Sequence, residues 1–407
     1  MTALRQTLIF LTLGFMTTVN ALSQTPPPDD RMELIPRSFS SLIGFETDNF
    51  LDAWKAFTRS CRLITGATNA LRTGLPTPDD LRTLCKEALE NQSLDNGEAR
   101  RFFQTRFQPF EIIPKNSVRP TEPAFLTGYY EPIVPGSLQR SAEYSEPLLS
   151  RPDDLVGLDP KMTYPGLPAG LASARRKPNG ELEPYPDRKA IDGGALADRV
   201  KPVVWVRDAI EAFMIHVQGS AAIKLDSGDM LRVTYAGRNG HPYTSIGKVL
   251  VDKREVPIEQ MSLLRMKQWV RDNGQQLGEK GRALLHQNES FIFFSADTTG
   301  DRQEGPIGAV GAPLSALRSI AIDRTVWPYG LPFWLESDIP WTEPGGENLA
   351  FRRLMIAQDT GSAIVGPARA DIYFGSGDAA GVLAGGIRHP GRMFVLLPRS
   401  APDSGRP

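Results

Sequence analysis

The sequence lacks several features that would point to common protein classes. Its 407 residues carry 46 Lys and Arg against 47 Asp and Glu, so the formal net charge is −1 and no excess of positive charge favours a nucleic-acid partner. Only 2 cysteines occur, and neither they nor the histidines are spaced as metal ligands. We therefore expect no metal ion and no nucleic acid. The histidines are His216, His241, His286 and His389.

Motifs for nucleotides and for serine nucleophiles are also missing. The sequence holds no G-x-S-x-G elbow, no P-loop and no dinucleotide fingerprint that opens a strand–helix unit. These absences argue against the common serine hydrolases and nucleotide-dependent enzymes, and we expect no organic cofactor. Carboxylates remain as the groups that would carry out catalysis.

The N-terminus has the pattern of a secretory signal peptide over residues 1–21. Arg5 supplies a positive charge, Leu8–Met16 is apolar, and Val19-Asn20-Ala21 is a small-residue cleavage site. The alternative is a membrane anchor, although the apolar run is shorter than the ~20 residues that a span requires. No cysteine near the site can accept a lipid. We expect a periplasmic protein, and peripheral association with the outer membrane stays open.

The two cysteines, Cys61 and Cys85, lie in the helical patterns NFLDAWKAFTRSCRLIT and TPDDLRTLCKEALE. An exported protein meets an oxidising compartment, so these patterns favour a disulfide between two packed helices. Two buried thiols are the alternative.

The apolar pattern divides the chain into helical and strand-rich parts. Residues 38–110 read mostly as helix, and a further helix is predicted in VRDAIEAFMIHVQGS. Strands on both sides of Asn239-Gly240 predict a β-hairpin, because this dipeptide favours tight hairpin turns. The chain is strand-rich from Phe291 onwards, and we expect disorder at 22–37 and 401–407.

The glycine-rich stretch QDTGSAIVGPARADIYFGSGD, residues 358–378, holds three aspartates. An aspartic peptidase would need two D-[TS]-G copies whose aspartates share a proton, and only one copy occurs. Asp359 follows an apolar strand and has the alternative role of a turn residue. Asp378 precedes a run of small residues and has the alternative role of a helix N-cap.

Asp371 differs from the other two because it begins the strand DIYFG. Ile372 and Phe374 alternate with Tyr373, and no Lys or Arg lies within one residue of the carboxyl. Apolar surroundings favour the neutral form of a carboxyl, as a general acid requires.

The three-aspartate stretch, together with other blocks of the sequence, resembles the membrane-bound lytic transglycosylase A (MltA) family, which has a C-terminal three-aspartate domain. The resemblance rests on QDTGSAIVGPARADIYFGSGDAAG together with FLTGYYEP, MIHVQGS, HQNESFIFFS and GPIGAVGAPLSALRSIAIDRTVWPYGLPFWLES, and it runs from Ser38 to Pro398. It implies a mainly β protein with N-terminal helices. A double-psi β-barrel domain would comprise 38–135 and 278–400, with a β-rich domain inserted at 136–277 and a glycan groove between them.

The resemblance implies a peptidoglycan lytic transglycosylase without a cofactor. Such an enzyme cleaves the β-1,4 bond between N-acetylmuramic acid and N-acetylglucosamine and leaves a 1,6-anhydro end without using water. The middle aspartate of the family signature corresponds to Asp371, which would act as the single acid and base. The alternatives are an inverting hydrolase on the same barrel, which needs a second carboxylate, and a non-catalytic wall-binding module. The chain departs from the family in having no lipid-acceptor cysteine, and Ser362 stands where many relatives have glycine.

The resemblance also suggests residues that support catalysis or bind the glycan. We expect glycan strands as the ligand, other cell-wall enzymes as candidate partners, and a monomer. Glu131 would be the second carboxylate of a hydrolase, although Glu-Pro more often marks a turn. Gln218, Gly219 and Ser220 would bind the glycan, and the alternative is that Gly219 simply ends a helix. The supporting residues are Asp359, Asp378, Thr127, Tyr129, Tyr130, Gln218, Gly219, Ser220 and Gly361.

Overall fold

The structure is a computed structural model that describes residues 30–66, 70–91, 94–115, 121, 123–159, 162–297 and 305–399. The expected signal peptide and C-terminal tail lie outside these ranges. Part of the expected leader is ordered, because Met32–Pro36 forms strand β1 and pairs antiparallel with β2 (Phe107–Pro114). No helix in the described ranges is long and apolar enough to span a membrane.

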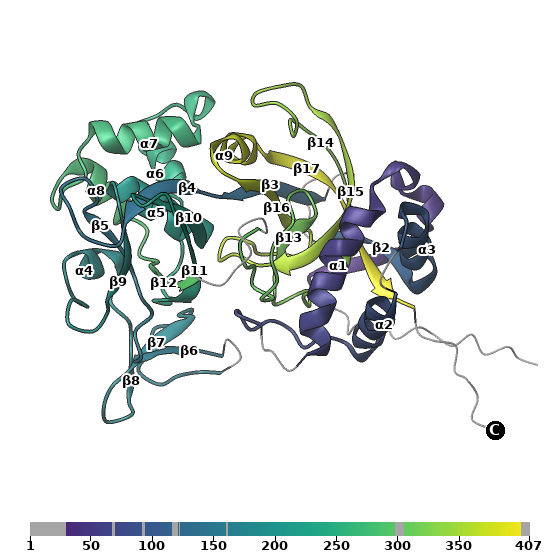
Figure 1. Cartoon of the computed structure of the whole chain (residues 1–407), viewed down its shortest axis with the longest axis horizontal. Coiled ribbons are helices and arrows are strands. Elements are labelled where there is room, and N and C mark those ends of the chain that lie inside the picture. The colour runs from purple at the N-terminus through teal and green to yellow at the C-terminus, as the bar shows by residue number, and fades with distance from the viewer. Residues whose placement is uncertain are drawn as a thin grey trace, which may run out of the picture.

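A closed barrel forms the centre of the larger unit (Figure 1). Its sheet has the order β1-β2-β17-β14-β15-β13-β16-β3, and an additional β17–β3 pairing joins six of these strands into a ring. Two pairings in the ring, β13 with β15 and β16 with β3, are parallel. The expected barrel is thereby confirmed. The strands are β3 (Ala124–Glu131), β13 (Ser319–Ile322), β14 (Pro332–Ile339), β15 (Leu349–Asp359), β16 (Arg369–Ser376) and β17 (Arg388–Pro398).

Three N-terminal helices pack against one side of the barrel (Figure 1): α1 (Phe50–Thr65), α2 (Asp79–Glu90) and α3 (Asn96–Arg106). The side chain of Asn49 caps α1, and Asp95 forms a capping box with Glu98 at the start of α3. The apolar faces of these helices bury aromatic rings in the barrel core. The short 3₁₀ turns η1 (Phe39–Ser41) and η2 (Phe45–Thr47) precede α1. The disulfide Cys61–Cys85 joins α1 to α2, as expected, with 4.8 Å between the Cα atoms.

The second unit is built around a six-stranded sheet of order β12-β11-β10-β4-β9-β5. Figure 1 shows β3 of the barrel leading directly into β4 of this sheet. The expected helix is α5 (Ala209–Gln218), which covers the sheet with its apolar residues. The sheet strands are β4 (Ile133–Ser137), β5 (Glu146–Leu149), β9 (Pro202–Val206), β10 (Ser220–Leu225), β11 (Met230–Arg238) and β12 (Ile292–Asp297).

Smaller elements complete the two units. A three-stranded sheet, β6-β7-β8, lies at the edge of the second unit (Figure 1). Helix α9 packs against β3 and β16 of the barrel. The elements are β6 (Leu155–Gly157), β7 (Ser173–Arg176), β8 (Leu182–Glu183), α4 (Arg188–Asp192), α6 (Ile246–Asp252), η3 (Ile258–Gln260), α7 (Leu263–Asp272), α8 (Lys280–Leu285) and α9 (Asp378–Gly385).

The second unit extends further along the chain than the predicted boundary at 277. Helix α8 packs with α7 through a core that includes Leu284 and Trp269. Strand β12 pairs with β11, and its Phe294 lies in the core of the second sheet. The apolar run of β12 marks a buried strand, but it does not reveal which sheet the strand joins.

The predicted hairpin at Asn239-Gly240 is wrong. Strand β11 pairs with β10 and β12, and no strand follows Gly240 directly. The buried Asn239 amide donates to the Pro186 carbonyl at 3.0 Å and accepts from the Phe291 N–H at 2.8 Å. Gly240 has φ +93°, and an added Cβ would lie 2.3 Å from the Ser173 carbonyl oxygen. The pair therefore joins loops inside the second unit.

We predict that the double variant Cys61→Ala/Cys85→Ala lowers the free energy of unfolding by about 3 kcal/mol, because the crosslink restricts the unfolded chain over the 24-residue separation. Urea denaturation followed by circular dichroism measures the change. Wild-type protein unfolded under reductant is the control and should match the variant. Equal stability of oxidised wild type and variant would contradict the prediction.

Candidate active site

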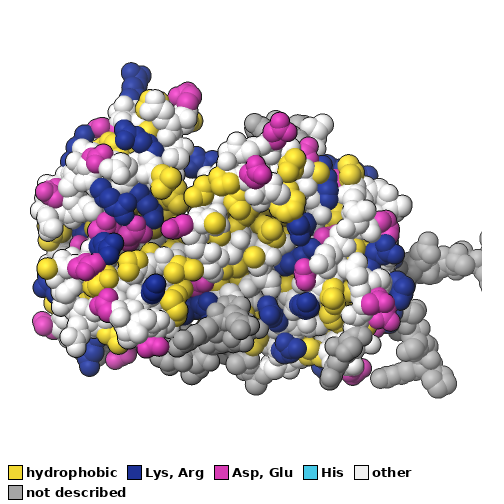
Figure 2. Space-filling view, turned by 45° about the horizontal axis from the view of Figure 1, so that its top comes forward, with side chains coloured by type: hydrophobic (Ala, Val, Ile, Leu, Met, Phe, Trp, Pro, Cys, Tyr) yellow, Lys and Arg dark blue, Asp and Glu magenta, His cyan; other side chains and the backbone are white. Residues whose placement is uncertain are grey.

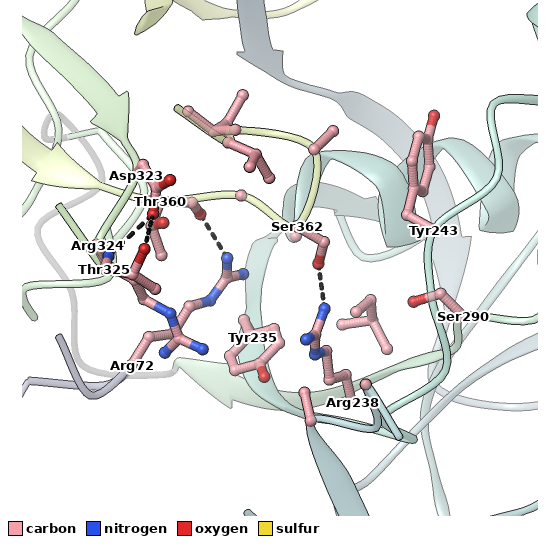
Figure 3. A pocket seen from close by; sticks show the side chains of 18 of the residues that line it. Arg72, Tyr235, Arg238, Tyr243, Ser290, Asp323, Arg324, Thr325, Thr360 and Ser362 are labelled. Carbon is pink, nitrogen blue, oxygen red and sulfur yellow. Dashed lines mark hydrogen bonds between the residues drawn. The ribbon is translucent and has the colours of Figure 1, made fainter. Parts of the chain in front are cut away.

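A cavity of about 720 Å³ lies between the barrel and the second unit. The barrel contributes Asp359 and Asp371, and the second unit contributes Gln218, Tyr235 and Arg238. Figure 3 shows side chains of both units around this space. On the face seen in Figure 2, acidic and basic side chains are interspersed over both units, as the balanced net charge leads one to expect. The cavity lies between the two units, where the family resemblance implied a groove.

Asp371 is held at the cavity by the parallel pairing of β16 with β3, which places it beside Thr127. The Thr127 hydroxyl donates a hydrogen bond to Oδ1 of Asp371. The same hydroxyl oxygen accepts from Arg369 Nη2 at 2.7 Å. Because a guanidinium can only donate, the hydroxyl proton is directed to Asp371. Oδ2 of Asp371 is then the oxygen that can carry a proton towards a ligand.

Burial raises the pKa of Asp371 above its ordinary value, and the nearby charge of Asp359 adds to this effect. The charge of Arg369 and the hydrogen bond from Thr127 act in the opposite direction, because both favour the carboxylate. The buried Ala370 and Ile372 point to the opposite face of the strand, into the barrel core, so the apolar setting expected from the sequence belongs to that face. The recorded neighbours of the Asp371 carboxyl are instead Thr127, Arg369 and Asp359. Arg369 was not among the predicted site residues. Its position two residues before Asp371 on the same strand would have indicated a shared face.

Asp359 ends β15 and lines the cavity with both carboxylate oxygens engaged. Oδ2 accepts from the Tyr129 hydroxyl at 3.0 Å, and Oδ1 accepts from the N–H groups of Ala309 at 2.9 Å and Thr360 at 2.8 Å. Burial, followed by the charges of Asp359 and Asp371, raises the pKa of Tyr129 well above its ordinary value. Tyr129 therefore stays a neutral donor that links the site to Asp359.

Asp378 does not line the cavity. It is exposed in the first turn of α9, where the N-cap is Gly377 rather than Asp378. A carboxylate at this position interacts favourably with the helix N-terminus. The structure thus separates Asp378 from Asp359 and Asp371, although the three share one sequence block.

The other predicted supporting residues fall into two groups. Gln218, Gly219 and Gly361 line the cavity, and Gly219 also ends α5 with φ +82°, which is the alternative that the sequence left open. Tyr130 is instead buried in the barrel core, where an added Cβ on Gly381 would lie 2.7 Å from its ring. Ser220 is buried at the start of β10 and borders a small hollow beside the main cavity.

Glu131 is fully buried and has no role in the cavity. Its carboxylate forms an ion pair with Arg232 at 2.8 Å and accepts from the Ser376 hydroxyl at 2.6 Å. The interpretation of Glu-Pro as a simple turn is wrong, since Glu131 ends strand β3. The carboxylate joins β3 to β11 and β16, so it is not placed to activate a water molecule.

Three further arginines of the cavity were not predicted from the sequence: Arg72, Arg238 and Arg324. None of the three belongs to a sequence motif with a recognised spacing, so the sequence does not indicate a role for them. Within the described ranges, no group of three His, Cys, Asp or Glu side chains converges to hold a metal ion.

We predict that Asp371→Asn raises the free energy of unfolding at pH 7. The folded state raises the pKa of Asp371, so it binds a proton more tightly than the unfolded state, and stability falls as pH rises through that pKa. Asn keeps the acceptor for Thr127 and removes the penalty. Below the unfolded pKa of about 3.9 the difference should vanish. Thermal unfolding across pH measures it.

Asp378→Asn is the matched control for this stability prediction. It should slightly lower stability at pH 7, because it removes a favourable charge at the α9 N-terminus. An Asp371→Asn variant that is less stable than wild type at pH 7 would contradict the raised pKa assigned to Asp371.

Known proteins match both units of the chain. The MltA specific insert domain matches residues 125–295, and the 3D domain matches residues 318–397. The membrane-bound lytic murein transglycosylase A of Escherichia coli K12 is 34% identical over 283 residues, which is 69% of this chain and 67% of the relative.

Solved structures agree with this match. A membrane-bound lytic murein transglycosylase from Agrobacterium tumefaciens superimposes with a TM-score of 0.78 at 33% identity, covering 90% of this chain and 98% of that one. MltA from E. coli with bound chitohexaose gives a TM-score of 0.61 at 26% identity, covering 92% of this chain and 93% of that one. On the sequence match to both units and the shared fold, this chain belongs to the MltA family of lytic murein transglycosylases.

Proposed function

We propose that this protein is a lytic transglycosylase that cleaves the glycan strands of peptidoglycan, with Asp371 as its single general acid and base. The observation that carries the proposal is the setting of Asp371, a half-buried carboxyl with a raised pKa that lines a cavity between two units. Relatives named lytic murein transglycosylases support the reaction class, and one of them has been solved with a bound glycan, chitohexaose.

The first step uses Asp371 as an acid. The proton on Oδ2 passes to the glycosidic oxygen as the bond from that oxygen to the muramic acid C1 breaks, which leaves positive charge on the sugar ring. The Asp371 carboxylate that results is stabilised by the Thr127 hydroxyl and by the positive charge of Arg369. The same contacts therefore support the ionised form after the proton has left.

The second step uses Asp371 as a base. The C6 hydroxyl of the same sugar attacks C1, and its proton passes to Asp371, which returns to the neutral acid. Since the nucleophile belongs to the substrate, the attack is intramolecular and benefits from a high effective concentration. The product carries a 1,6-anhydro ring and no water is consumed.

Hydrolysis on the same barrel is the weaker alternative. An inverting hydrolase needs a second carboxylate to activate water. Glu131 is buried in an ion pair, and both oxygens of Asp359 accept hydrogen bonds from the protein. Neither carboxylate is therefore free to take a proton from a water molecule. A non-catalytic binding module would not need an acid with a raised pKa in its cavity.

We further infer that the enzyme acts in the periplasm, where peptidoglycan lies. The disulfide Cys61–Cys85 is consistent with an oxidising compartment. The curated relatives are named membrane-bound, whereas this chain has no cysteine near the expected cleavage site to carry a lipid. A monomeric state and other cell-wall enzymes as partners stay predictions.

We predict that Asp371→Asn lowers the release of anhydro-muropeptides by about 10²–10⁴-fold or more, because general acid–base catalysis is lost at both steps. Mass spectrometry of digested sacculi measures the products and separates anhydro ends from hydrolysed ends. Binding to sacculi should survive, since the cavity keeps its shape. Asp359→Asn and Asp378→Asn are the controls and should keep measurable turnover. Near-normal activity of a folded Asp371→Asn protein would overturn the assignment.

We also predict that Thr127→Val moves the descending limb of the kcat/KM profile to higher pH. The reaction needs protonated Asp371, so activity falls as pH rises through its pKa. The Thr127 hydroxyl lowers that pKa, and its removal lets the acid stay protonated at higher pH. Thr127→Ser keeps the hydroxyl and should restore the wild-type limb. An unmoved limb in Thr127→Val would show that Thr127 does not act through Asp371.

A further inference from the structure

Three arginines, Arg72, Arg238 and Arg324, lie together at one part of the cavity and are called the arginine cluster below. They come from separate parts of the fold. Arg72 lies in the loop between α1 and α2, Arg324 follows β13, and Arg238 ends β11 of the second unit. Figure 3 shows the three side chains around the same space, with Tyr235 beside them. The packing of the two units against each other therefore brings three positive charges together.

Each arginine is held in place through a neutral oxygen. Arg72 Nη1 donates to the Thr360 carbonyl at 2.6 Å, and its guanidinium lies 3.8 Å from the centre of the Tyr235 ring. Arg238 Nη1 donates to the Ser362 hydroxyl. Arg324 Nη1 donates to the Thr73 carbonyl at 2.6 Å. A guanidinium has five N–H donors, so these bonds orient the three groups and leave most of their donors available.

The described part of the chain does not neutralise the charges of the cluster. None of the three arginines forms an ion pair with a carboxylate in the described part of the chain, and their recorded hydrogen bonds go to neutral oxygens. Burial lowers the pKa of Arg238, and the charges of Arg324 and Arg72 lower it further. The three groups thus repel one another across the cavity.

Two of the four carboxylates that line the same cavity, Asp323 and Asp359, are engaged by other parts of the fold. Asp323 accepts from the N–H of Thr325 at 2.9 Å and of Gly366 at 2.8 Å, so it joins its own loop to the segment at Gly366. Asp359 is engaged by Tyr129 and by backbone N–H groups. A group of oriented, uncompensated guanidinium groups is complementary to a carboxylate, which can accept two N–H donors from one arginine.

We propose that the arginine cluster is an anion subsite that binds carboxylate groups carried by the glycan strand. This inference rests on the proposed function, and it adds the chemical feature by which the enzyme prefers peptidoglycan to a neutral glycan. Two groups of peptidoglycan carry this chemistry: the lactyl carboxylate of a peptide-free muramic acid, and the carboxylates of a peptide stem. The subsite lies beside the loop from Asp359 to Ser362, since Thr360 and Ser362 accept hydrogen bonds from Arg72 and Arg238.

The test measures binding without turnover, in an Asp371→Asn background. Three probes are compared by calorimetry: chitohexaose, which has no carboxylate; peptide-free glycan strands, which have lactyl carboxylates; and peptide-bearing strands, whose lactyl groups are amidated and whose stems carry the carboxylates. The variants are Arg238→Gln and Arg324→Gln, because glutamine retains a donor for Ser362 or Thr73. Arg207→Gln is the control, since it removes one exposed positive charge of the second unit, which pairs with Glu143 outside the cavity.

We expect each cavity variant to weaken binding of a carboxylate-bearing strand by about 10- to 100-fold, as lost hydrogen bonds to a charged group would. Chitohexaose binding should be unchanged, and Arg207→Gln should change neither. A loss confined to peptide-free strands assigns the lactyl carboxylate, and a loss confined to peptide-bearing strands assigns the stem. Either result, or both, supports the subsite.

Equal effects on all three probes, or no effect on any, would overturn the subsite. Thermal unfolding shows whether each variant is folded, and removal of one of three mutually repelling charges should not lower stability. The proposed catalytic role is tested separately, by comparing the products released by wild type and by Asp371→Asn. If Asp371→Asn retained turnover while the arginine variants lost selective binding, the acid assignment would fail and the subsite would stand.

Discussion

The parallel pairing of β16 with β3 determines how the catalytic carboxyl is presented. It places Asp371 beside Thr127, although the two residues are separated by 244 positions. On its other side, β3 pairs with β17 and closes the barrel. Gly128 allows α9 to pack closely over this strand, because an added Cβ would lie 2.7 Å from the Ala384 Cα. Barrel closure and the geometry of the site therefore depend on the same strand.

The pKa of Asp371 is set by effects that act in opposite directions. Burial favours the neutral acid, while Thr127 and Arg369 favour the carboxylate. A deeply buried carboxyl without those partners would hold its proton too firmly, and a well-solvated one would lose it at neutral pH. One group can thus serve as acid and then as base. Asp359, fixed by Tyr129 and the backbone, raises the pKa of Asp371 through its charge and lines the same cavity.

The second unit contributes to the site by supplying the opposite wall of the cavity. Helix α5 ends there at Gly219, and β11 ends there at Arg238. The Asp359–Ser362 loop meets this wall through the bond between Arg238 and Ser362. Relative placement of the two units consequently affects both the acid and the arginine cluster, and a ligand in the cavity would contact both units.

Local features of the fold were determined by the sequence itself. The α1 and α3 helices begin where Asn49 and Asp95 can cap them, and α5 ends at a glycine that adopts a left-handed conformation. Cysteines on two neighbouring helical patterns predicted the disulfide, and an acid beside apolar strand residues indicated Asp371, although the strand begins two residues before the predicted start, at Arg369. These features depend on residues a few positions apart, or on a family signature that is continuous in sequence.

Only the tertiary structure decided which side chains meet. It placed Asp378 outside the cavity and Tyr130 in the core, and it made Asn239 a buried link between loops instead of a hairpin turn. The bond from Thr127 to Asp371 and that from Arg72 to the Thr360 carbonyl join residues 244 and 288 positions apart. Hydrophobic periodicity specifies which face of a strand is buried, but not which distant strand or loop lies next to it. The partners of Asp371 and the arginine cluster therefore appear only when the barrel closes and the second unit packs against it.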